Sequence, residues 1–162
     1  MFRVVLRDER GIKDGIINMK VRFKKLTQSA VCPTYGTEFS AGADLYAANE
    51  VPVVIGAHET AMIPTGIAIE LERGTVGLIC ARSGLASKRD LAPANKVGVI
   101  DCDYRGEIRV ALHNHGSAPQ TVEPHERIAQ LVITPYVTAE FEETDELSDT
   151  VRGAGGFGST GN

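Results

Sequence analysis

Cysteine is scarce in this chain of 162 residues, and long hydrophobic runs are missing. The three cysteines, Cys32, Cys80 and Cys102, are an odd number without metal-ligand spacing, so neither a disulfide framework nor a zinc knuckle is indicated. The first apolar run, residues 4–6, is too short for a signal-peptide core, and no run has the length of a membrane span. We therefore expect a protein of the reducing cytoplasm that is neither secreted nor embedded in a membrane.

An excess of positive charge is missing as well. The chain has 17 Lys and Arg residues against 21 Asp and Glu residues, a formal net charge of −4, which argues against a general nucleic-acid-binding surface. A local cationic pocket for a small anion remains open. Its candidate residues are Arg82, Lys88, Arg105, Arg109, Arg127 and Arg152.

Helical periodicity is almost absent, and strand patterns dominate. Short apolar segments separated mostly by Gly, Pro or Asn recur about every 8–12 residues, which predicts an all-β fold such as a distorted jelly-roll β-barrel. We expect a single short helix over residues 83–89, with Ser83 as its N-cap. The expected strands cover residues 21–23, 45–47, 51–55, 67–71, 76–81, 108–112, 128–133 and 137–141.

Three segments are expected along the chain. Residues 1–18 are mixed in charge and precede residues 19–23, which resemble a second N-terminus because they start with Met19. We therefore expect residues 1–18 to be an N-terminal extension of unknown role. Residues 19–141 form the β-barrel core. Residues 142–162 form a flexible C-terminal arm, because an acidic stretch typical of a solvated connector leads into a glycine-rich end.

The glycine-rich end, residues 152–162, has a composition suited to grasping a nucleotide. Five of the residues 153–162 are glycines, whose backbone N–H groups are free to wrap an anion. Arg152 adds donors for phosphate, and the ring of Phe157 could stack on a flat base. A GxGxxG pattern is present without the strand and helix of a dinucleotide site, and the Lys of a P-loop is missing. The alternative is a solvated, disordered terminus.

Three further polar features suit phosphate or metal. Arg82, Ser83 and Gly84 open the expected helix, where free N–H groups attract an anion; the alternative is a helix cap with a surface arginine. Gln130 lies on an apolar strand and needs a partner, either a phosphate oxygen or neighbouring backbone. Asp44 lies in a small-residue strand that permits a water-mediated metal contact, unless it is a solubilising residue on an edge strand.

Residues 95–107 carry the most pointed signal for chemistry. Glycines at positions 98 and 106 bound a hairpin-like excursion in which strand-forming residues lead directly into Asp101. A carboxylate so placed can cap a turn or accept a proton from water. Tyr104 follows one short turn later and could form a floor under a sugar; the alternative is a turn rich in Asp and Gly with a core-facing Tyr.

Histidines offer a weaker signal for a metal. His113 and His115 could share one face of a strand and, with His58 or His125, suggest a metal site. Because no carboxylate or thiolate ligand pattern accompanies them, the sequence favours surface or loop histidines.

Five segments in chain order resemble the five motifs of the trimeric deoxyuridine triphosphate nucleotidohydrolases, the dUTPases. Each motif alone is a modest signal, but five in order with suitable spacing are highly specific. The resemblance spans the chain from about Lys20 to its end and leaves residues 1–18 outside. The segments are Ala41-Gly-Ala-Asp-Leu-Tyr46, Arg82-Ser-Gly-Leu-Ala86, Gly98-Val-Ile-Asp-Cys-Asp-Tyr-Arg-Gly106, Arg127-Ile-Ala-Gln-Leu131 and Arg152-Gly-Ala-Gly-Gly-Phe-Gly-Ser-Thr-Gly161.

The resemblance implies a jelly roll that closes into a homotrimer, with active sites at subunit interfaces and covered by another subunit's tail. It implies a dUTP diphosphatase that forms dUMP and pyrophosphate, limits uracil incorporation into DNA and supplies dUMP for thymidylate synthesis. It makes Asp101 the group that activates the water attacking the α-phosphorus. Tyr104 would pack beneath the deoxyribose and exclude a ribose 2′-hydroxyl, while main-chain groups around Val99 and Ile100 would read uracil and exclude the thymine methyl.

The resemblance also assigns the phosphate and metal contacts. The Arg-Ser-Gly segment would hold the phosphates with Gln130, while Arg152 and Ser159 close over them and Phe157 covers the uracil. Mg²⁺ would be chelated chiefly by the triphosphate, with Asp44 bound through water rather than directly. The full set of expected substrate-binding residues is Arg82, Ser83, Gly84, Asn95, Val99, Ile100, Tyr104, Arg109, Gln130, Arg152, Phe157, Gly158 and Ser159.

Two departures from the family pattern concern turn geometry. Ala81 replaces a proline often found before the Arg-Ser-Gly motif, and Pro124-His125-Glu126 replaces a Gly-Asp pair commonly seen before the fourth motif's arginine. Two rival functions remain. A dCTP deaminase resembles the same fold but hydrolyses the exocyclic amine of cytosine; the Asp101 segment and the glycine tail favour the hydrolase. A catalytically silent homotrimer that binds nucleotide or a protein partner is the rival from another class.

Overall fold

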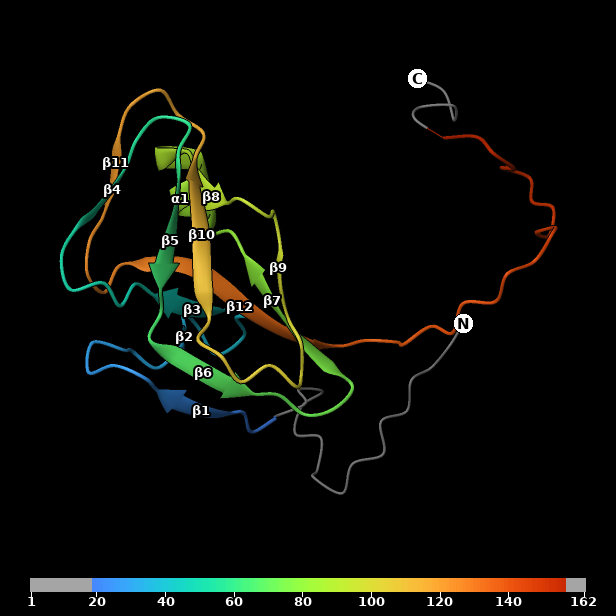
Figure 1. Cartoon of the computed structure of the whole chain (residues 1–162), viewed down its shortest axis with the longest axis horizontal. Coiled ribbons are helices and arrows are strands. Elements are labelled where there is room, and N and C mark those ends of the chain that lie inside the picture. The colour runs from blue at the N-terminus through green and yellow to red at the C-terminus, as the bar shows by residue number, and fades with distance from the viewer. Residues whose placement is uncertain (1–18, 157–162) are drawn as a thin grey trace.

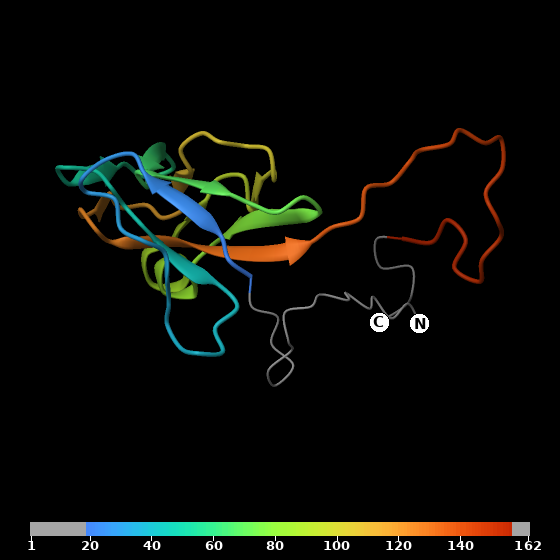
Figure 2. The same ribbon diagram turned by 90° about the horizontal axis from the view of Figure 1, so that it is seen from below.

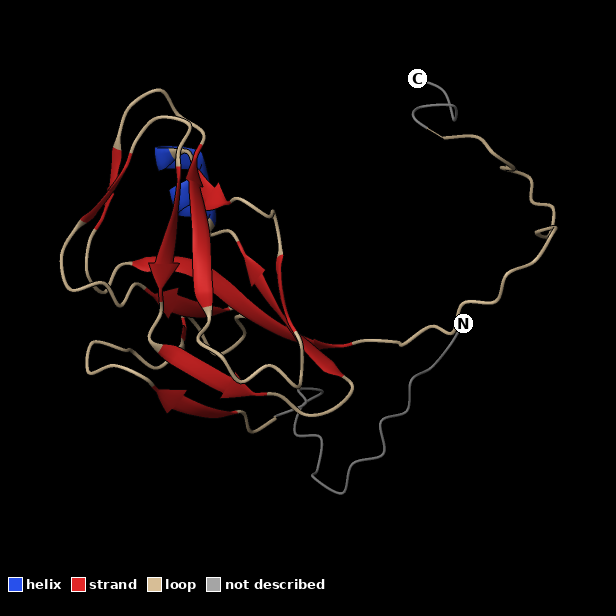
Figure 3. Ribbon diagram, in the orientation of Figure 1, coloured by secondary structure: helices blue, strands red, loops and turns tan. Residues whose placement is uncertain are grey.

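A computed structural model describes residues 19–156 of the chain, so the expected extension 1–18 and residues 157–162 lie outside the described part. Strands and one short helix make up its regular structure (Figures 1 and 3), which confirms the predicted all-β class. The elements are β1 (Arg22–Lys25), β2 (Thr34–Tyr35), β3 (Ala43–Tyr46), β4 (Val53–Ile55), β5 (Thr60–Pro64), β6 (Ile67–Glu70), β7 (Thr75–Cys80), α1 (Ser83–Arg89), β8 (Leu91–Pro93), β9 (Gly98–Ile100), β10 (Arg109–Asn114), β11 (Gln120–Val122) and β12 (Arg127–Pro135).

The largest sheet has the order β2-β3-β12-β7-β9, and all its neighbours are antiparallel. Its central strand β12 is the longest, and Figure 2 shows it running the length of the barrel. A second sheet has the order β5-β10-β8, and the pairs β1-β6 and β11-β4 complete the wall. A register shift between Arg127 and Ala129 bends β12 where it passes β3, as a β-bulge does.

Alternating side chains from these sheets fill one core. In β10, for example, Val110, Leu112 and Asn114 are buried while their neighbours face outward. Each buried Leu, Ile or Val contributes roughly 1.5–3 kcal/mol relative to exposure. The buried amide of Asn114 donates to the carbonyls of Ile55 and Ala118 at 3.1 and 2.8 Å and thereby ties three chain segments together. The largest buried apolar residues are Leu45, Ile55, Ile63, Ile67, Leu91, Ile108, Val110, Leu112, Val122 and Ile128.

The helix α1 begins and ends where the sequence predicts, but its N-cap is not Ser83. Arg82 occupies that position with an extended backbone (φ −86°, ψ 127°), and no side chain caps the helix. The physical reason is that Ser83 is already helical, so Arg82 flanks the helix, and a guanidinium has no acceptor atom with which to cap the first N–H groups. The helix buries only Leu85 and ends at Asp90, which takes the left-handed conformation (φ 53°).

One expected strand does not form. Residues 137–141 follow the end of β12 without strand structure, and Val137 and Phe141 are 92% and 95% exposed. A strand needs a neighbour for its main-chain groups, and within the described residues this segment has none. After Tyr136, whose N–H still donates to the carbonyl of Gly74 at 3.1 Å, the chain instead runs away from the barrel as an arm (Figures 1 and 2), with every residue of the acidic stretch 142–149 exposed.

The sequence patterns did not predict four of the short strands. The strands β2, β5, β8 and β11 have two, five, three and three residues, too few for a clear alternation. Within residues 19–156, no helix has both the length and the hydropathy required to cross a bilayer.

Candidate functional site

A cavity of about 370 Å³ opens between β9, the turn that follows it and the face of β10. Six residues singled out from the sequence line it: Asn95, Val99, Ile100, Asp101, Tyr104 and Arg109. The remaining lining was not named among the site residues and is mostly apolar; Gly98 and Glu107 belong to the segment 95–107 singled out from the sequence, whereas the pairing of distant strands brings the others here. The whole remaining lining consists of Met62, Ile79, Pro93, Gly98, Glu107, Val110 and Ala111.

The strand β9 gives this cavity one of its walls; we call the cavity the nucleoside pocket after the role that the sequence predicts for its residues. It pairs with β7 in the register Ile100↔Gly77 and Gly98↔Ile79, and it is the last strand of its sheet. Gly98 permits the close approach, because a Cβ there would lie 3.1 Å from Cβ of Ile79. The chain then turns, with the N–H of Tyr104 donating to the carbonyl of Asp101 at 3.1 Å, and the turn leaves Asp101 exposed.

Tyr104 is held in one orientation by its own turn. Its hydroxyl donates to the carbonyl of Glu107 at 3.0 Å, and its ring lies against Gly106. A Cβ at Gly106 would be only 2.3 Å from that hydroxyl oxygen, so the ring needs a glycine there. Since Tyr104 is 44% exposed, the alternative of a core-facing tyrosine is wrong.

Arg105 fixes the same turn from the other side. Its guanidinium donates to the carbonyls of Cys102 and Tyr104 at 2.8 and 2.9 Å. Its contact with Glu70 is longer, 3.7 Å, and both side chains are partly exposed, so that contact contributes little to the position of the turn. The position of the Asp101 turn is therefore built into the chain before any ligand binds.

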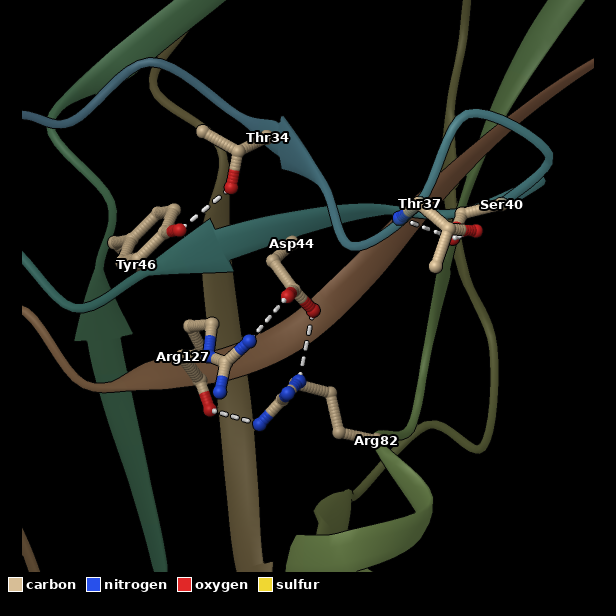
Figure 4. Close-up of polar contacts among 7 residues, drawn as sticks. All are labelled: Thr34, Thr37, Ser40, Asp44, Tyr46, Arg82 and Arg127. Atoms are coloured by element: carbon tan, nitrogen blue, oxygen red, sulfur yellow. Dashed lines mark hydrogen bonds and ion pairs between the residues drawn. The ribbon is translucent and has the colours of Figure 1, made fainter.

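A second polar group, the Asp44 cluster, consists of Asp44, Arg82 and Arg127 (Figure 4). Asp44 is 4% exposed and accepts from Arg82 Nε at 2.8 Å and from an Arg127 guanidinium nitrogen at 3.2 Å. Arg82 also donates to the carbonyl of Arg127 at 3.3 Å. Because β3 lies between β2 and β12, the alternative of a solubilising edge-strand aspartate is wrong. The ion-paired role of Arg127 was not predicted, although it begins the fourth motif.

Gln130 lies beside this cluster. It is paired in register with Asp44 on β3 and with Cys80 on β7. A Cβ at Gly42 would be 3.2 Å from Cβ of Gln130, so the glycine leaves room for the glutamine. Ser83 and Gly84 are exposed at the start of α1, next to Arg82.

The two groups do not meet within one chain. The lining of the nucleoside pocket includes none of Asp44, Arg82, Ser83, Gly84 or Gln130. Arg152 is exposed in the arm, where its Nε donates to the carbonyl of Gly155 at 2.9 Å. The expected contacts of Phe157, Gly158 and Ser159 lie outside the described residues. The structure therefore joins part of the predicted site and leaves the residues expected to bind phosphate separate.

His113 and His115 belong to neither the pocket lining nor the Asp44 cluster. His113 and His115 share a face, with ring centroids 4.4 Å apart, and Thr60 lies 2.9 Å from Nδ1 of His113. Desolvation and the neighbouring His113 lower the pKa of His115. In the described part of the chain, no three metal-ligating side chains are grouped for a metal ion.

Comparison with known proteins identifies the family. A sequence model described as dUTPase matches residues 28–161. The chain belongs to the dUTPase family. A deoxyuridine 5'-triphosphate nucleotidohydrolase of Nautilia profundicola is 50% identical over 143 residues, which cover 88% of this chain and 99% of that protein. The same enzyme of Rickettsia felis is 50% identical over 143 residues, covering 88% and 97%.

Solved dUTPase structures share the fold. A mutant of the Staphylococcus bacteriophage 80alpha dUTPase with dUpNHpp is 29% identical, covers 90% of this chain and 100% of that chain, and gives a TM-score of 0.82. A mutant dUTPase from phage phi11 of S. aureus, described for its coordination of a structural Mg(II) ion, is 25% identical, covers 81% and 100%, and gives 0.74. The predicted jelly-roll fold is thus confirmed.

One departure from the family pattern now has a structural account. His125 occupies the place where the dUTPase motif commonly has glycine, and its backbone takes the left-handed conformation (φ 61°) that favours glycine. Its N–H donates to the carbonyl of Ala47 at 2.9 Å, which holds the turn. The altered turn therefore takes, with a histidine, a conformation that glycine adopts more readily.

Proposed function

We propose that this chain hydrolyses dUTP to dUMP and pyrophosphate. The observation that carries the proposal is the convergence of Asp101, Tyr104 and the β9 backbone on one cavity of nucleoside size. Membership of the dUTPase family and relatives that bear the name of this activity support it. They also favour the hydrolase over a dCTP deaminase of the same fold.

The base would bind along the free edge of β9. This strand is the last of its sheet, so the main-chain groups on its outer edge have no strand partner among the described residues. Uracil presents a donor flanked by two acceptors, which matches a strand edge around Val99 and Ile100. Asn95 lies at the same wall. A wall this close leaves little room for the methyl group of thymine.

The sugar would lie on Tyr104. Its ring is fixed by the bond to Glu107 and by the contact with Gly106, so it cannot retreat to admit a larger group. A ribose 2′-hydroxyl would then meet an aromatic face without a partner, which is unfavourable because an unpaired polar group loses its hydration. Arg109 of β10 lines the pocket and provides positive charge.

Asp101 would act as the general base. Its carboxylate accepts a proton from a water molecule, whose oxygen forms a bond to the α-phosphorus. The bond from that phosphorus to the bridging oxygen breaks, and the electron pair leaves with pyrophosphate. Placement of a general base contributes about 10²–10⁴ in rate, so much of the remaining acceleration must come from charged groups around the phosphates.

Those charged groups would come from other subunits of a homotrimer. Arg82, Ser83, Gly84 and Gln130 suit the phosphates, yet they lie outside the nucleoside pocket of their own chain. A site shared between chains reconciles the two observations. A tail from a further subunit, with Arg152, Phe157, Gly158 and Ser159, would cover the nucleotide, and an exposed arm leaving the barrel is suited to that reach. A dUTPase neighbour with the dUTP analogue dUpNHpp supports the choice of ligand.

The donor set fits Mg²⁺ held mainly by the nucleotide. Asp44 provides the hard oxygen atoms that Mg²⁺ prefers, but both oxygens already accept from arginines, which suits a contact through water rather than direct ligation. When bound, Mg²⁺ would withdraw charge from the phosphoryl oxygens. The phage phi11 dUTPase with a structural Mg(II) ion supports the choice of metal.

In the cell this reaction would limit uracil incorporation into DNA and supply dUMP for thymidylate synthesis. The cytoplasm is the proposed location, in keeping with three free cysteines. We propose the division of the chain that the sequence suggests, with residues 1–18 as an extension, 19–141 as the core and 142–162 as the arm, and with residues 137–141 leading from the barrel into the arm. No nucleic acid and no membrane enter the proposed activity.

A pyrophosphate-release assay with Mg²⁺ across dUTP, UTP, dCTP and dTTP tests the proposal. Rapid turnover of dUTP alone is expected. Ammonia release from dCTP would instead identify a deaminase, and silence toward all four nucleotides would favour a binding module. Analytical ultracentrifugation of the same sample tests the homotrimer, and a monomer that retains full activity would contradict the shared site.

A further inference from the structure

The last residue of α1, Arg89, has three polar partners on other elements. Its Nε donates to the side chain of Gln120 at 3.1 Å. One guanidinium nitrogen donates to the carboxylate of Glu126 and the other to the carbonyl of Thr121. Side-chain exposure is 29% for Arg89 and 20% for Glu126, so the pair is largely removed from solvent. Arg89 therefore fastens the C-terminal end of the helix to β11 and to the turn before β12.

Glu126 is itself fixed by that turn. Its other carboxylate oxygen accepts from the N–H of Glu123 at 3.0 Å, and its carbonyl accepts from the N–H of Ala47 at 2.8 Å. The next residue in the chain is Arg127, which holds Asp44. Glu126 is thus one peptide bond away from a member of the Asp44 cluster.

The two ends of α1 are consequently tied to the same short stretch of chain. At its start, Arg82 bonds Asp44 and the carbonyl of Arg127; at its end, Arg89 bonds Glu126. Glu126 is also a departure from the family pattern, which commonly has aspartate before this arginine. The contacts that join both ends of α1 to residues 126 and 127 therefore use a glutamate, whose longer side chain reaches the helix.

We propose that the Arg89–Glu126 pair is a positioning device for the phosphate-binding residues of α1. The inference rests on the proposed function, since it concerns how Arg82, Ser83 and Gly84 are held for a triphosphate. Neither Arg89 nor Glu126 touches the nucleotide in this scheme. They act through the placement of α1 relative to Asp44 and Arg127.

The physical need for such a device follows from the size of the helix. An isolated helix of seven residues is unstable in water, and α1 buries only Leu85. Its position must come from tertiary contacts at its ends. Removing one partner of a largely buried ion pair leaves the other charge without compensation, so the helix end should shift toward solvent.

The test compares Arg89→Met and Glu126→Gln with a matched control, Arg22→Met. Arg22 also forms an arginine–glutamate pair, with Glu70 at 2.6 Å, but its side chain is 81% exposed and it lies on β1. Exposed pairs of this kind contribute little to stability. Each protein is assayed for the KM and kcat of dUTP, and for competitive inhibition by pyrophosphate and by deoxyuridine.

We expect both variants at the positioning pair to raise the KM for dUTP and the inhibition constant of pyrophosphate by roughly 10- to 100-fold, because small misplacements of binding groups have effects of this size. The inhibition constant of deoxyuridine should stay unchanged, and Arg22→Met should match the parent chain in every constant. Arg89→Lys keeps the positive charge but loses the forked donors of the guanidinium. Its KM for dUTP and its inhibition constant for pyrophosphate should lie between those of the parent chain and of Arg89→Met. Parallel loss of pyrophosphate and deoxyuridine inhibition would overturn the proposal, as would no change in either.

The two proposals fail in different ways. If the parent chain does not hydrolyse dUTP, the proposed function is wrong. If it does, and only thermal stability changes in both variants, the positioning role is wrong and the pair is structural. Because Glu126→Gln is nearly isosteric, it keeps the test open should Arg89→Met fail to fold.

Discussion

The nucleoside pocket and the Asp44 cluster differ in how complete each is within a single chain. The pocket is a cavity formed by β9, its turn and β10. The turn carries the ring of Tyr104 and the candidate general base Asp101, which is exposed. The cluster is a buried carboxylate neutralised by two arginines. A nucleoside needs a shaped wall, whereas a triphosphate needs positive charge, and here the positive charge is occupied by the protein itself. Under the proposed function, one chain would supply the site for the base, and several chains together would supply the site for the phosphates.

The largest effect expected in the nucleoside pocket comes from Asp101→Asn. The variant keeps the shape of the turn but cannot accept a proton, so kcat should fall by about 10²–10⁴ while nucleotide binding persists. Pyrophosphate release at fixed time points measures kcat, and equilibrium titration with a non-hydrolysable analogue measures nucleotide binding. Turnover at the parent rate would remove the basis of the mechanism.

Deleting residues 152–162 tests the part of the proposed site that other subunits would supply. The truncated chain should keep its fold and its association state, because the last strand of the described residues 19–156 ends at Pro135. Its turnover should drop by on the order of 10²-fold, since several phosphate donors are lost together. Ultracentrifugation and circular dichroism serve as controls, and dissociation or unfolding would contradict the division of labour between barrel and arm.

Asp44→Asn should break the cluster without touching the pocket. The two arginines would lose their carboxylate, and because both are partly exposed the cost should be moderate, about 1–3 kcal/mol in the free energy of unfolding. Urea denaturation measures it. Deoxyuridine inhibition should be unchanged, and a weaker inhibition would show that the two regions are not independent.

Gly106→Ala should disturb the pocket without touching the cluster. The added methyl group would meet the hydroxyl of Tyr104 at 2.3 Å, so the ring must move. Discrimination between dUTP and UTP should weaken by about 10-fold, the size typical of small steric changes in a pocket. The ratio of kcat/KM for the two nucleotides reports it. Gly74→Ala serves as a control, because an added Cβ there meets no atom within 4 Å and the position lies outside both groups. Its φ of 87° predicts a loss of stability, with unchanged discrimination between dUTP and UTP.

The smallest effect concerns pH and lies outside both regions. The pKa of His115 is lowered by desolvation and by His113, so the unfolded chain binds the proton more readily than the folded chain. Stability should therefore be complete above about pH 6.5 and decline as the pH falls toward the folded-state pKa. His115→Asn should flatten this part of the curve of unfolding free energy against pH. An unchanged slope would show that other groups dominate.

Much of the nucleoside pocket could be predicted because its residues are close in sequence. Asn95, Val99, Ile100, Asp101 and Tyr104 fall within ten positions, and local turn chemistry brings them together. Met62 and Ala111 could not be predicted, because they reach the pocket through the pairing of β5 with β10. The missing strand at 137–141 has the same origin, since a pattern suited to a strand forms one only where a neighbour accepts its hydrogen bonds.

By itself, the sequence determined the all-β class, the bounds of α1, the five motifs and the residues around Asp101, since alternation, turn chemistry and motif order act over a few neighbouring positions. Only the tertiary structure decided that Asp44 is buried between Arg82 and Arg127, that Tyr104 rests on Gly106, and that Arg89 reaches Glu126. These contacts join residues by side-chain reach and sheet register. Both depend on how the whole chain packs, and no local pattern encodes them.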